Sequence, residues 1–378
     1  MNIVHVVGAR PNFMKAAPVM KALGTRPNVT QTLVHTGQHY DAEMSEIFFE
    51  QLKMPKPDVS LAVGSGTHAE QTAAIMVRFE PVVVERKPDW VLVYGDVNST
   101  VATALVSSKL GIKVAHVEAG LRSFDRSMPE EVNRLLTDQI ADLLLTPSED
   151  GDRNLLREGI PRNKIRLVGN TMIDTLIQLL PLAASQVPKD LPARYALVTL
   201  HRPSNVDDPI ALRKLCEVLA WVSTRIEVFF PVHPRTRRRL QEFDILVNLP
   251  GLHLLPPMPY LEFLGMQRRA SVVLTDSGGI QEETTYLGVP CLTLRENTER
   301  PITTTMGTNV VVGRDMERLR TEILAVLSGD FRRGTIPRLW DGHASERIAE
   351  CLCDTAERED LPCLSQPRVQ ANRSLHQI

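Results

Sequence analysis

The sequence is poor in several features that mark whole classes of protein. None of its apolar runs approaches the ~18 residues that a membrane-spanning helix requires, so no membrane association is expected. The formal net charge of −2 gives no electrostatic reason to bind nucleic acid or acidic membranes. The amino terminus enters a strand pattern at once, without a positively charged leader, and we therefore expect a cytoplasmic protein. The cysteines include no C-x-x-C pair, which predicts neither a zinc site nor a disulfide framework; they are residues 216, 291, 351, 353 and 363.

What the sequence does contain is a long alternation of apolar strands with amphipathic helices. Its 378 residues exceed what one hydrophobic core usually supports. The alternation predicts an α/β protein of two Rossmann-like, doubly wound domains that face a central cleft. We place them at residues 1–182 and 195–354, with a linker at 183–194 where the periodicity breaks, and with a loose tail at 355–378. Strands are expected at Ile3–Val7, Thr32–His35, Val91–Tyr94, Val114–Val117, Leu143–Thr146, Ala196–Leu200, Glu227–Phe230, His253–Leu255, Ser271–Leu274, Pro290–Thr293 and Val310–Val312.

The segment TDSGGIQEE, Thr275–Glu283, is the most informative part of the second half. It follows an apolar strand and leads into a helix, so backbone N–H groups around Ser277, Gly278 and Gly279 are left open at the helix N-terminus. Such a turn can hold a phosphate group. A Ser-Gly-Gly turn with no ligand is the structural alternative, and the segment alone does not decide between the two.

Polar residues also follow the strands of the first half. GARPNFMK places Arg10 and Lys15 just after the first strand, where a guanidinium and an ammonium could hold phosphate oxygens. A glycine turn with solvated cations is the alternative. Gly8 has no second glycine two residues later, so the dinucleotide fingerprint is absent and a nicotinamide cofactor is not supported.

Three acids come at or after later strand ends, at Asp96, Glu118 and Glu130. Asp96 and Glu130 have a structural alternative as helix caps or first-turn residues. Glu118 ends a largely apolar strand and must be partnered or open to a cleft. His201 follows the first strand of the second half, where a structural histidine is the usual alternative, and Arg300 lies in a loop after another strand. Acids beside cations suit proton transfer next to an anionic leaving group.

With these segments assembled, the chain resembles the non-hydrolysing UDP-N-acetylglucosamine 2-epimerase family over residues 1–355 approximately. The resemblance is carried by GARPNFMK, TGQHYD, YGDVNST, HVEAGLRS, PEEVNR, VGNTMIDTL, HRPSN, PVHP, TDSGGIQEE, LGVPCL and ENTERP. It implies a glycosyltransferase-B-like pair of domains, a UDP-sugar in the cleft, a homodimer and no cofactor or metal. It also implies interconversion of UDP-N-acetylglucosamine and UDP-N-acetylmannosamine by anti elimination of UDP to 2-acetamidoglucal and re-addition.

The resemblance also implies roles for single residues. Catalytic positions are matched by Asp96, Glu118, Glu130 and His201, and nucleotide-binding positions by Arg10, Lys15, Ser277, Gly278, Gly279, Glu283 and Arg300. Parts of a regulatory pocket for a second UDP-sugar are matched by Gln38, His39, Arg202 and His233. The chain departs from the family pattern at Ala9, Asn12, Ala74 and Ser204, which leaves the regulation and the exact sugar open. The alternatives are a hydrolysing epimerase, an epimerase of a modified UDP-sugar, a glycosyltransferase of the same fold and a non-catalytic sensor.

Overall fold

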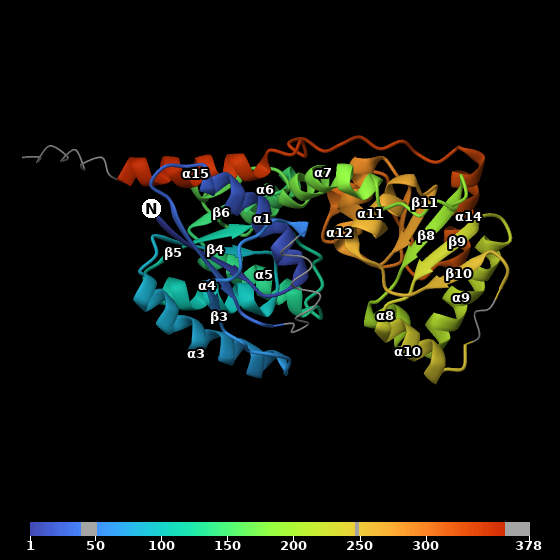
Figure 1. The fold of residues 1–378 in the computed structure, drawn as a ribbon, viewed down its shortest axis with the longest axis horizontal. Coiled ribbons are helices and arrows are strands. Elements are labelled where there is room, and N and C mark those ends of the chain that lie inside the picture. The colour runs from blue at the N-terminus through green and yellow to red at the C-terminus, as the bar shows by residue number, and fades with distance from the viewer. Residues whose placement is uncertain (39–50, 246–248, 360–378) are drawn as a thin grey trace, which may run out of the picture.

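A computed structural model describes residues 1–38, 51–245 and 249–359; the predicted regulatory residue His39 lies outside these ranges. The described chain forms two parallel sheets, which stand apart in Figure 1 with helices around each. The first sheet has the order β3-β2-β1-β4-β5-β6-β7. Its strands are β1 (Asn2–Val7), β2 (Thr30–His35), β3 (Val59–Ser60), β4 (Trp90–Tyr94), β5 (Lys113–Val117), β6 (Leu143–Thr146) and β7 (Ile165–Leu167).

Side chains of the first sheet alternate between two hydrophobic layers, as the strand geometry requires. Ile3 and Leu92 pack on the side of α1 and α7, whereas Val4 and Val91 pack on the side of α3 and α4. The helices of this half are α1 (Arg10–Gly24), α3 (His68–Arg86), α4 (Asn98–Lys109), α5 (Pro129–Ile140), α6 (Glu149–Arg157) and α7 (Thr171–Ala184), with a short 3₁₀ turn at Arg162–Lys164.

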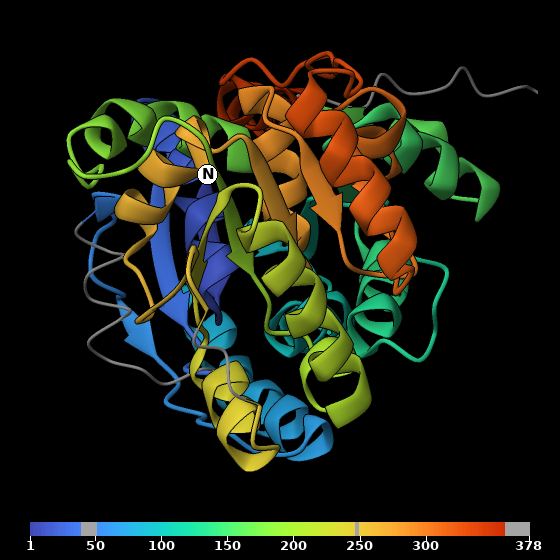
Figure 2. The same cartoon turned by 90° about the vertical axis from the view of Figure 1, so that its right-hand side faces the viewer.

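The second sheet has the order β10-β9-β8-β11-β12-β13, and helices cover both of its faces (Figure 2). Its strands are β8 (Tyr195–Thr199), β9 (Glu227–Pro231), β10 (Leu252–Leu255), β11 (Val272–Thr275), β12 (Cys291–Thr293) and β13 (Asn309–Val311). Its helices are α8 (Pro203–Val206), α9 (Pro209–Ser223), α10 (Pro234–Glu242), α11 (Tyr260–Arg269), α12 (Gly278–Leu287), α13 (Pro301–Thr305) and α14 (Met316–Ser328).

Two helices connect the halves. α7 packs against α1 in the first half and against α11 and α12 in the second. α15 (Ala344–Glu359) returns to the first half, where it packs on α1 and α7 (Figure 1). The sequence predicts residues 344–354 as part of the second half, because an amphipathic pattern does not say which core its apolar face joins. The first residues of the predicted tail, 355–359, belong to α15.

Every strand expected from the sequence overlaps an observed strand. The sequence does not predict β3 and β7, which are two and three residues long and too short for a recognisable pattern. The linker predicted at 183–194 starts slightly early, because α7 continues to Ala184. Among the described helices, none is both long and apolar enough to cross a lipid bilayer.

Candidate active site

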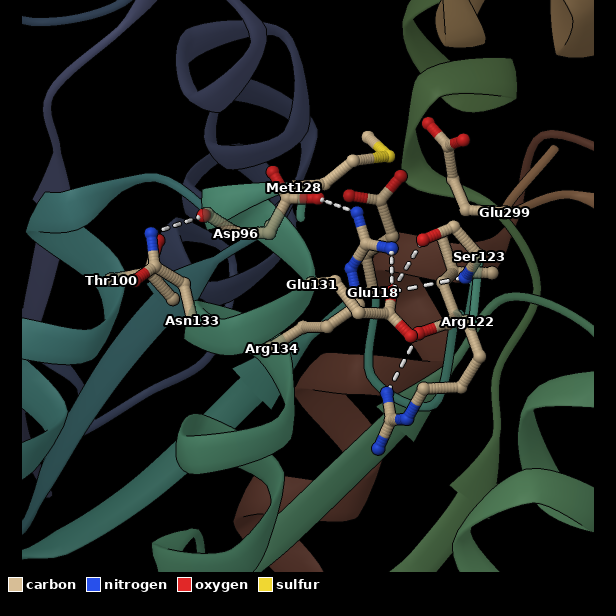
Figure 3. Close-up of polar contacts among 12 residues, drawn as sticks. Asp96, Thr100, Glu118, Arg122, Ser123, Met128, Glu131, Asn133, Arg134 and Glu299 are labelled. Carbon is tan, nitrogen blue, oxygen red and sulfur yellow. Dashed lines mark hydrogen bonds and ion pairs between the residues drawn. The ribbon is translucent and has the colours of Figure 1, made fainter. Parts of the chain in front are cut away.

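Asp96 follows β4 directly, and its carboxylate faces the α5 side chain Arg134 (Figure 3). Arg134 Nη2 forms an ion pair with Asp96 Oδ2, and Arg134 Nη1 lies 2.6 Å from Glu131 Oε2. Asn133 Nδ2 donates to the Asp96 backbone oxygen at 2.9 Å. Burial alone would raise the pKa of the Asp96 carboxyl, but the charges of Arg134 and Lys15 outweigh burial and hold that pKa below its usual range. Asp96 is therefore present as a carboxylate.

Glu118 follows β5 and is held by cations from both halves. Its Oε2 forms an ion pair with Lys15 Nζ, and its Oε1 lies 2.9 Å from Arg300 Nη2. The Glu118 backbone is left-handed, with φ of 74°. That conformation costs a non-glycine residue about 1 kcal/mol or more, and it persists where the surroundings hold it. A Cβ atom on Gly95 would meet Lys15 Nζ at 2.8 Å, so the glycine lets Lys15 approach Glu118.

Arg300 is the centre of an ion-pair network that joins the two halves. Besides Glu118, its Nε lies 2.9 Å from Glu282 Oε1 and its Nη1 lies 2.7 Å from Glu299 Oε1. Burial raises the pKa of Glu282 to about 7, although Arg300 acts against this rise. Burial would also raise the pKa of Glu299, but Arg300 and Arg295 outweigh it and hold that pKa well below the usual range. The buried Arg300 thus pairs with two carboxylates whose pKa values are shifted in opposite directions, upward for Glu282 and downward for Glu299.

The glycine turn lies beside this network. Ser277 is the N-cap of α12 in an extended conformation, and its side chain makes no capping hydrogen bond. A Cβ atom on Gly278 would lie 2.5 Å from Arg300 Nη1 and 2.8 Å from Glu299 Oε1. Only glycine therefore allows the Arg300 guanidinium to reach the helix N-terminus. Open N–H groups, a helix dipole and a guanidinium together form a strong site for an anion.

His201 follows β8 and is oriented by the buried Asp276. His201 Nδ1 lies 3.0 Å from Asp276 Oδ1, which assigns the proton to Nδ1 and leaves Nε2 available. Asp276 also accepts from the backbone N–H of Arg202 at 2.9 Å and from Asn205 Nδ2 at 3.1 Å. Burial works against ionisation, but His201 and these donors hold the pKa of Asp276 below its usual range. The His201 side chain is 42% exposed and can reach a ligand.

Charge effects show which residues of the two halves face one another. Burial lowers the pKa of His233, and the nearby charges of His201 and Arg10 lower it further. Arg202 has its pKa lowered by burial and Arg295, and Glu130 acts in the opposite direction. The charges of Arg10 and Glu130 of the first half therefore act on His233 and Arg202 of the second.

The structure thus brings most of the predicted site residues to facing strand ends, but two lie elsewhere. Glu283 is buried on α12 and accepts from Tyr260 of α11 at 2.9 Å, away from the Arg300 network. Its pKa is raised by burial to about 7. Gln38 is also buried, in the first half, where its Oε1 accepts from Ser99 N and Oγ at the start of α4.

The sequence analysis missed several charged residues of the site. Arg134 is four residues after Glu130 in the segment PEEVNR, and Glu299 precedes Arg300 in ENTERP. Asp276 precedes Ser277 in the glycine turn. Each stands inside a segment that had been singled out, so a charged residue beside a predicted ligand was an available signal. Its partner could not be read from the sequence.

Two parallel α/β sheets whose strand ends face each other across a charged network, with a glycine turn at a helix N-terminus, define the glycosyltransferase-B-like class of fold. Within this class the chain belongs to the UDP-N-acetylglucosamine 2-epimerase family, whose model matches residues 21–353. A glycotransferase of kitacinnamycin, 15% identical with a TM-score of 0.57, shares the fold alone.

Similar proteins cover nearly the whole chain. A UDP-N-acetylglucosamine 2-epimerase of Methanocaldococcus jannaschii is 44% identical, over 93% of this chain and 99% of that protein. A UDP-2,3-diacetamido-2,3-dideoxy-D-glucuronate 2-epimerase of Pseudomonas aeruginosa is 43% identical over the same shares. The crystal structure of a Methanocaldococcus jannaschii UDP-GlcNAc 2-epimerase in complex with UDP-GlcNAc and UDP matches with a TM-score of 0.86, at 43% identity, over 94% of this chain and 100% of that one.

Proposed function

We propose that this protein interconverts UDP-N-acetylglucosamine and UDP-N-acetylmannosamine without hydrolysing them. One observation carries the proposal beyond family membership: Glu118, the acid after β5, shares an ion-pair network with the glycine turn of the second half, and the charges of Lys15 and Arg300 also act on Asp96 after β4. A diphosphate at Gly278 would then lie beside Arg300, and Arg300 contacts Glu118 directly. The leaving group and the proton-transfer groups are thereby placed side by side.

The reaction follows from the chemistry of the sugar. No carbonyl activates the C2 proton, so inversion at C2 requires either an oxidant or the departure of a good leaving group. In the proposed reaction a carboxylate removes the C2 proton while the C1–O bond breaks and UDP leaves with the bonding electrons. The product is 2-acetamidoglucal. Addition of UDP to C1 and of a proton to the opposite face of C2 completes the inversion.

The residues divide into two groups in this proposal. Lys15, Arg300 and the open N–H groups of the α12 turn hold the diphosphate, with Arg10 facing them from the first half. Asp96, Glu118 and Glu130 move the proton and balance the charge that develops at C1. When both of its ring nitrogens carry a proton, His201, oriented by Asp276, can protonate or hydrogen-bond the departing phosphate through Nε2. Which acid serves which face is left open.

Glu118 has two roles in the proposed mechanism, as the partner of the phosphate-binding cations and as a base. Its carboxylate forms ion pairs with Lys15 and Arg300, the cations that the diphosphate needs. Arrival of the diphosphate draws these cations away and leaves the carboxylate of Glu118 available as a base.

The second candidate is the same reaction on a modified UDP-sugar. It is favoured by the 43% identity to the Pseudomonas aeruginosa UDP-2,3-diacetamido-2,3-dideoxy-D-glucuronate 2-epimerase, which nearly equals the 44% identity to the Methanocaldococcus jannaschii UDP-N-acetylglucosamine 2-epimerase. Competition between the two UDP-sugars for the enzyme, measured as the ratio of kcat/KM values, decides which is the substrate.

Proton NMR of UDP-N-acetylglucosamine with the enzyme in D2O, without an acceptor, tests the activity. We expect UDP-N-acetylmannosamine to appear and deuterium to enter at C2 of both sugars. Free N-acetylmannosamine would indicate a hydrolysing enzyme. A spectrum that stays unchanged until an acceptor is added would instead indicate a glycosyltransferase.

A homodimer is part of the same proposal, and a surface of the first half supports it. Val77 on α3 is 71% exposed, and on α5 Leu136 is 53% exposed. Between these helices lies a groove of about 620 Å³ lined by Met76 and Val132. Exposed apolar residues that line a groove are typical of an interface. Light scattering should give twice the chain mass, and the double variant Val77→Asp with Leu136→Asp should give the mass of a single chain.

A cytoplasmic location and a regulatory site for a second UDP-sugar are also predicted from the sequence, and both remain part of this proposal.

A further inference from the structure

A second charged cluster lies beneath the strand ends that carry Asp96 and Glu118. It contains His116 of β5, Asp138 of α5 and Arg122, and these three side chains are 1% exposed or less. Arg122 also pairs with Glu158 through two hydrogen bonds of 2.6 and 2.8 Å. None of the three buried side chains reaches the cleft, so none can act on a substrate directly.

His116 makes two hydrogen bonds, and both of its partners are acceptors. Its Nδ1 lies 2.7 Å from Asp138 Oδ1, and its Nε2 lies 2.8 Å from the Gly95 carbonyl oxygen. Both ring nitrogens must therefore carry a proton, which makes the side chain an imidazolium. The charges of His116 and Arg122 then balance those of Asp138 and Glu158, as a buried cluster requires.

The cluster makes hydrogen bonds to two backbone turns, and each of these turns carries a proposed catalytic acid. Gly95 immediately precedes Asp96, and its carbonyl accepts from His116. Gly120 follows Glu118 by two residues, and its N–H donates to Asp138 Oδ2 at 3.1 Å. Burial would raise the pKa of Asp138, but His116 and Arg122 outweigh it and keep this residue a carboxylate.

We propose that the His116–Asp138 pair is a positioning device that sets the distance and orientation of Asp96 relative to Glu118. The proposal rests on the proposed function. It accounts for the left-handed backbone of Glu118, because that conformation is held where the next turn is fixed through Gly120. It also gives a reason why a doubly protonated His116 lies at a buried position that substrate does not reach. Only the doubly protonated ring holds both turns at once.

His5 provides a matched control in the same sheet. It is a fully buried histidine on β1, and its Nδ1 lies 2.7 Å from the Tyr94 hydroxyl. Burial lowers the pKa of His5 to about 4, so it is neutral, and its bond is made to a side chain instead of to a strand-end turn. Loss of this bond should lower stability without moving either acid.

The test measures C2 deuterium exchange, UDP affinity and thermal stability for His116→Gln, His116→Phe, Asp138→Asn and His5→Phe. Titration with UDP counts the folded sites, and rates are expressed per site. Because a displacement near 1 Å can cost about 10²-fold in rate, we expect His116→Phe and Asp138→Asn to lose on the order of 10²-fold in kcat. Their UDP affinity should stay within a few-fold. His116→Gln keeps one donor and should recover part of the loss, and His5→Phe should keep the wild-type rate per site.

Two results would overturn the proposal: a wild-type rate per UDP-binding site in both His116→Phe and Asp138→Asn, or a loss of UDP affinity that matches the loss of rate. A wild-type protein without C2 exchange would contradict the proposed function instead. For this reason NMR of protein labelled with ¹⁵N-histidine tests the cluster independently of turnover. We expect two ring N–H signals that disappear in His116→Gln, and a neutral His116 ring would contradict the inference.

Discussion

The strand ends of the two halves differ in how far their polar groups are already satisfied. In the first half, Asp96 and Glu118 are both paired with cations. In the second half, Ser277 makes no capping bond and His201 is 42% exposed. Acids held by cations are placed precisely, whereas an open helix N-terminus is ready to receive an anion. The comparison indicates that the first half carries the acids of the proton chemistry, while the second half supplies the open helix N-terminus to which Arg10 and Lys15 add their charges.

The largest effect is expected from neutralising the acids of the first half. Asp96→Asn and Glu130→Gln should lose ~10²–10⁴-fold in rate, because general acid–base groups typically contribute that much. UDP affinity should stay within a few-fold, since both residues serve the sugar. C2 deuterium exchange and calorimetric titration with UDP measure the two quantities. Glu317→Gln on α14, whose side chain is 81% exposed, is the control. Full activity in both variants would remove these acids from the mechanism.

The residues proposed to hold the diphosphate should show the reverse pattern. Ser277→Ala combined with Arg10→Ala should weaken UDP binding by about 10²-fold or more, because each charge-assisted hydrogen bond contributes on the order of 1.5–3 kcal/mol. Folding should change little, since Arg10 is exposed and Ser277 is partly exposed. Calorimetric titration and thermal unfolding check the two expectations. An unchanged affinity for UDP would place the diphosphate elsewhere in the protein.

A smaller effect concerns stability and pH in the second half. Burial raises the pKa of Glu283 to about 7. The unfolded chain releases this proton near pH 4.5 and the folded chain near pH 7, so stability falls as the pH rises between these values. Glu283→Gln removes this titrating carboxyl group. In the absence of UDP, the variant should therefore be more stable than the wild type at pH 8, by about 3 kcal/mol at most. The gain should vanish at pH 4. Denaturant unfolding gives the free energy of unfolding of the variant and of the wild type at pH 4 and pH 8. A difference between the two proteins that is equal at both pH values would contradict the raised pKa of Glu283.

The smallest effect is a change of shape. A ligand that contacts both halves should draw them together, and residues 185–194 between α7 and β8 can absorb a rotation. Small-angle scattering should show a slightly more compact particle at saturating UDP. The sample must first be shown to be free of ligand. An identical curve with and without UDP would contradict closure on binding.

The sequence predicts the positions of these residues better than their partners. Asp96, Glu118 and Ser277 could be placed at strand ends, because parallel strands direct such residues to one edge of a sheet. Arg134 and Asp138 could not be assigned as partners, since their contacts join segments 38 and 22 residues apart and depend on how α5 packs. Glu282 and Glu283 are neighbours on one helix and face different ways, and only packing shows which of them meets Arg300.

The most direct test of the division between the halves is Glu118→Gln, measured for UDP affinity and C2 exchange in the same preparation. Glu118 forms ion pairs with Lys15 and Arg300, the cations proposed to hold the diphosphate. Removing its charge should release both cations to the diphosphate while abolishing a proton-transfer group. We predict that UDP binds at least as tightly as to the wild type, while C2 exchange falls by ~10²-fold or more. A parallel loss of affinity and exchange would contradict the account.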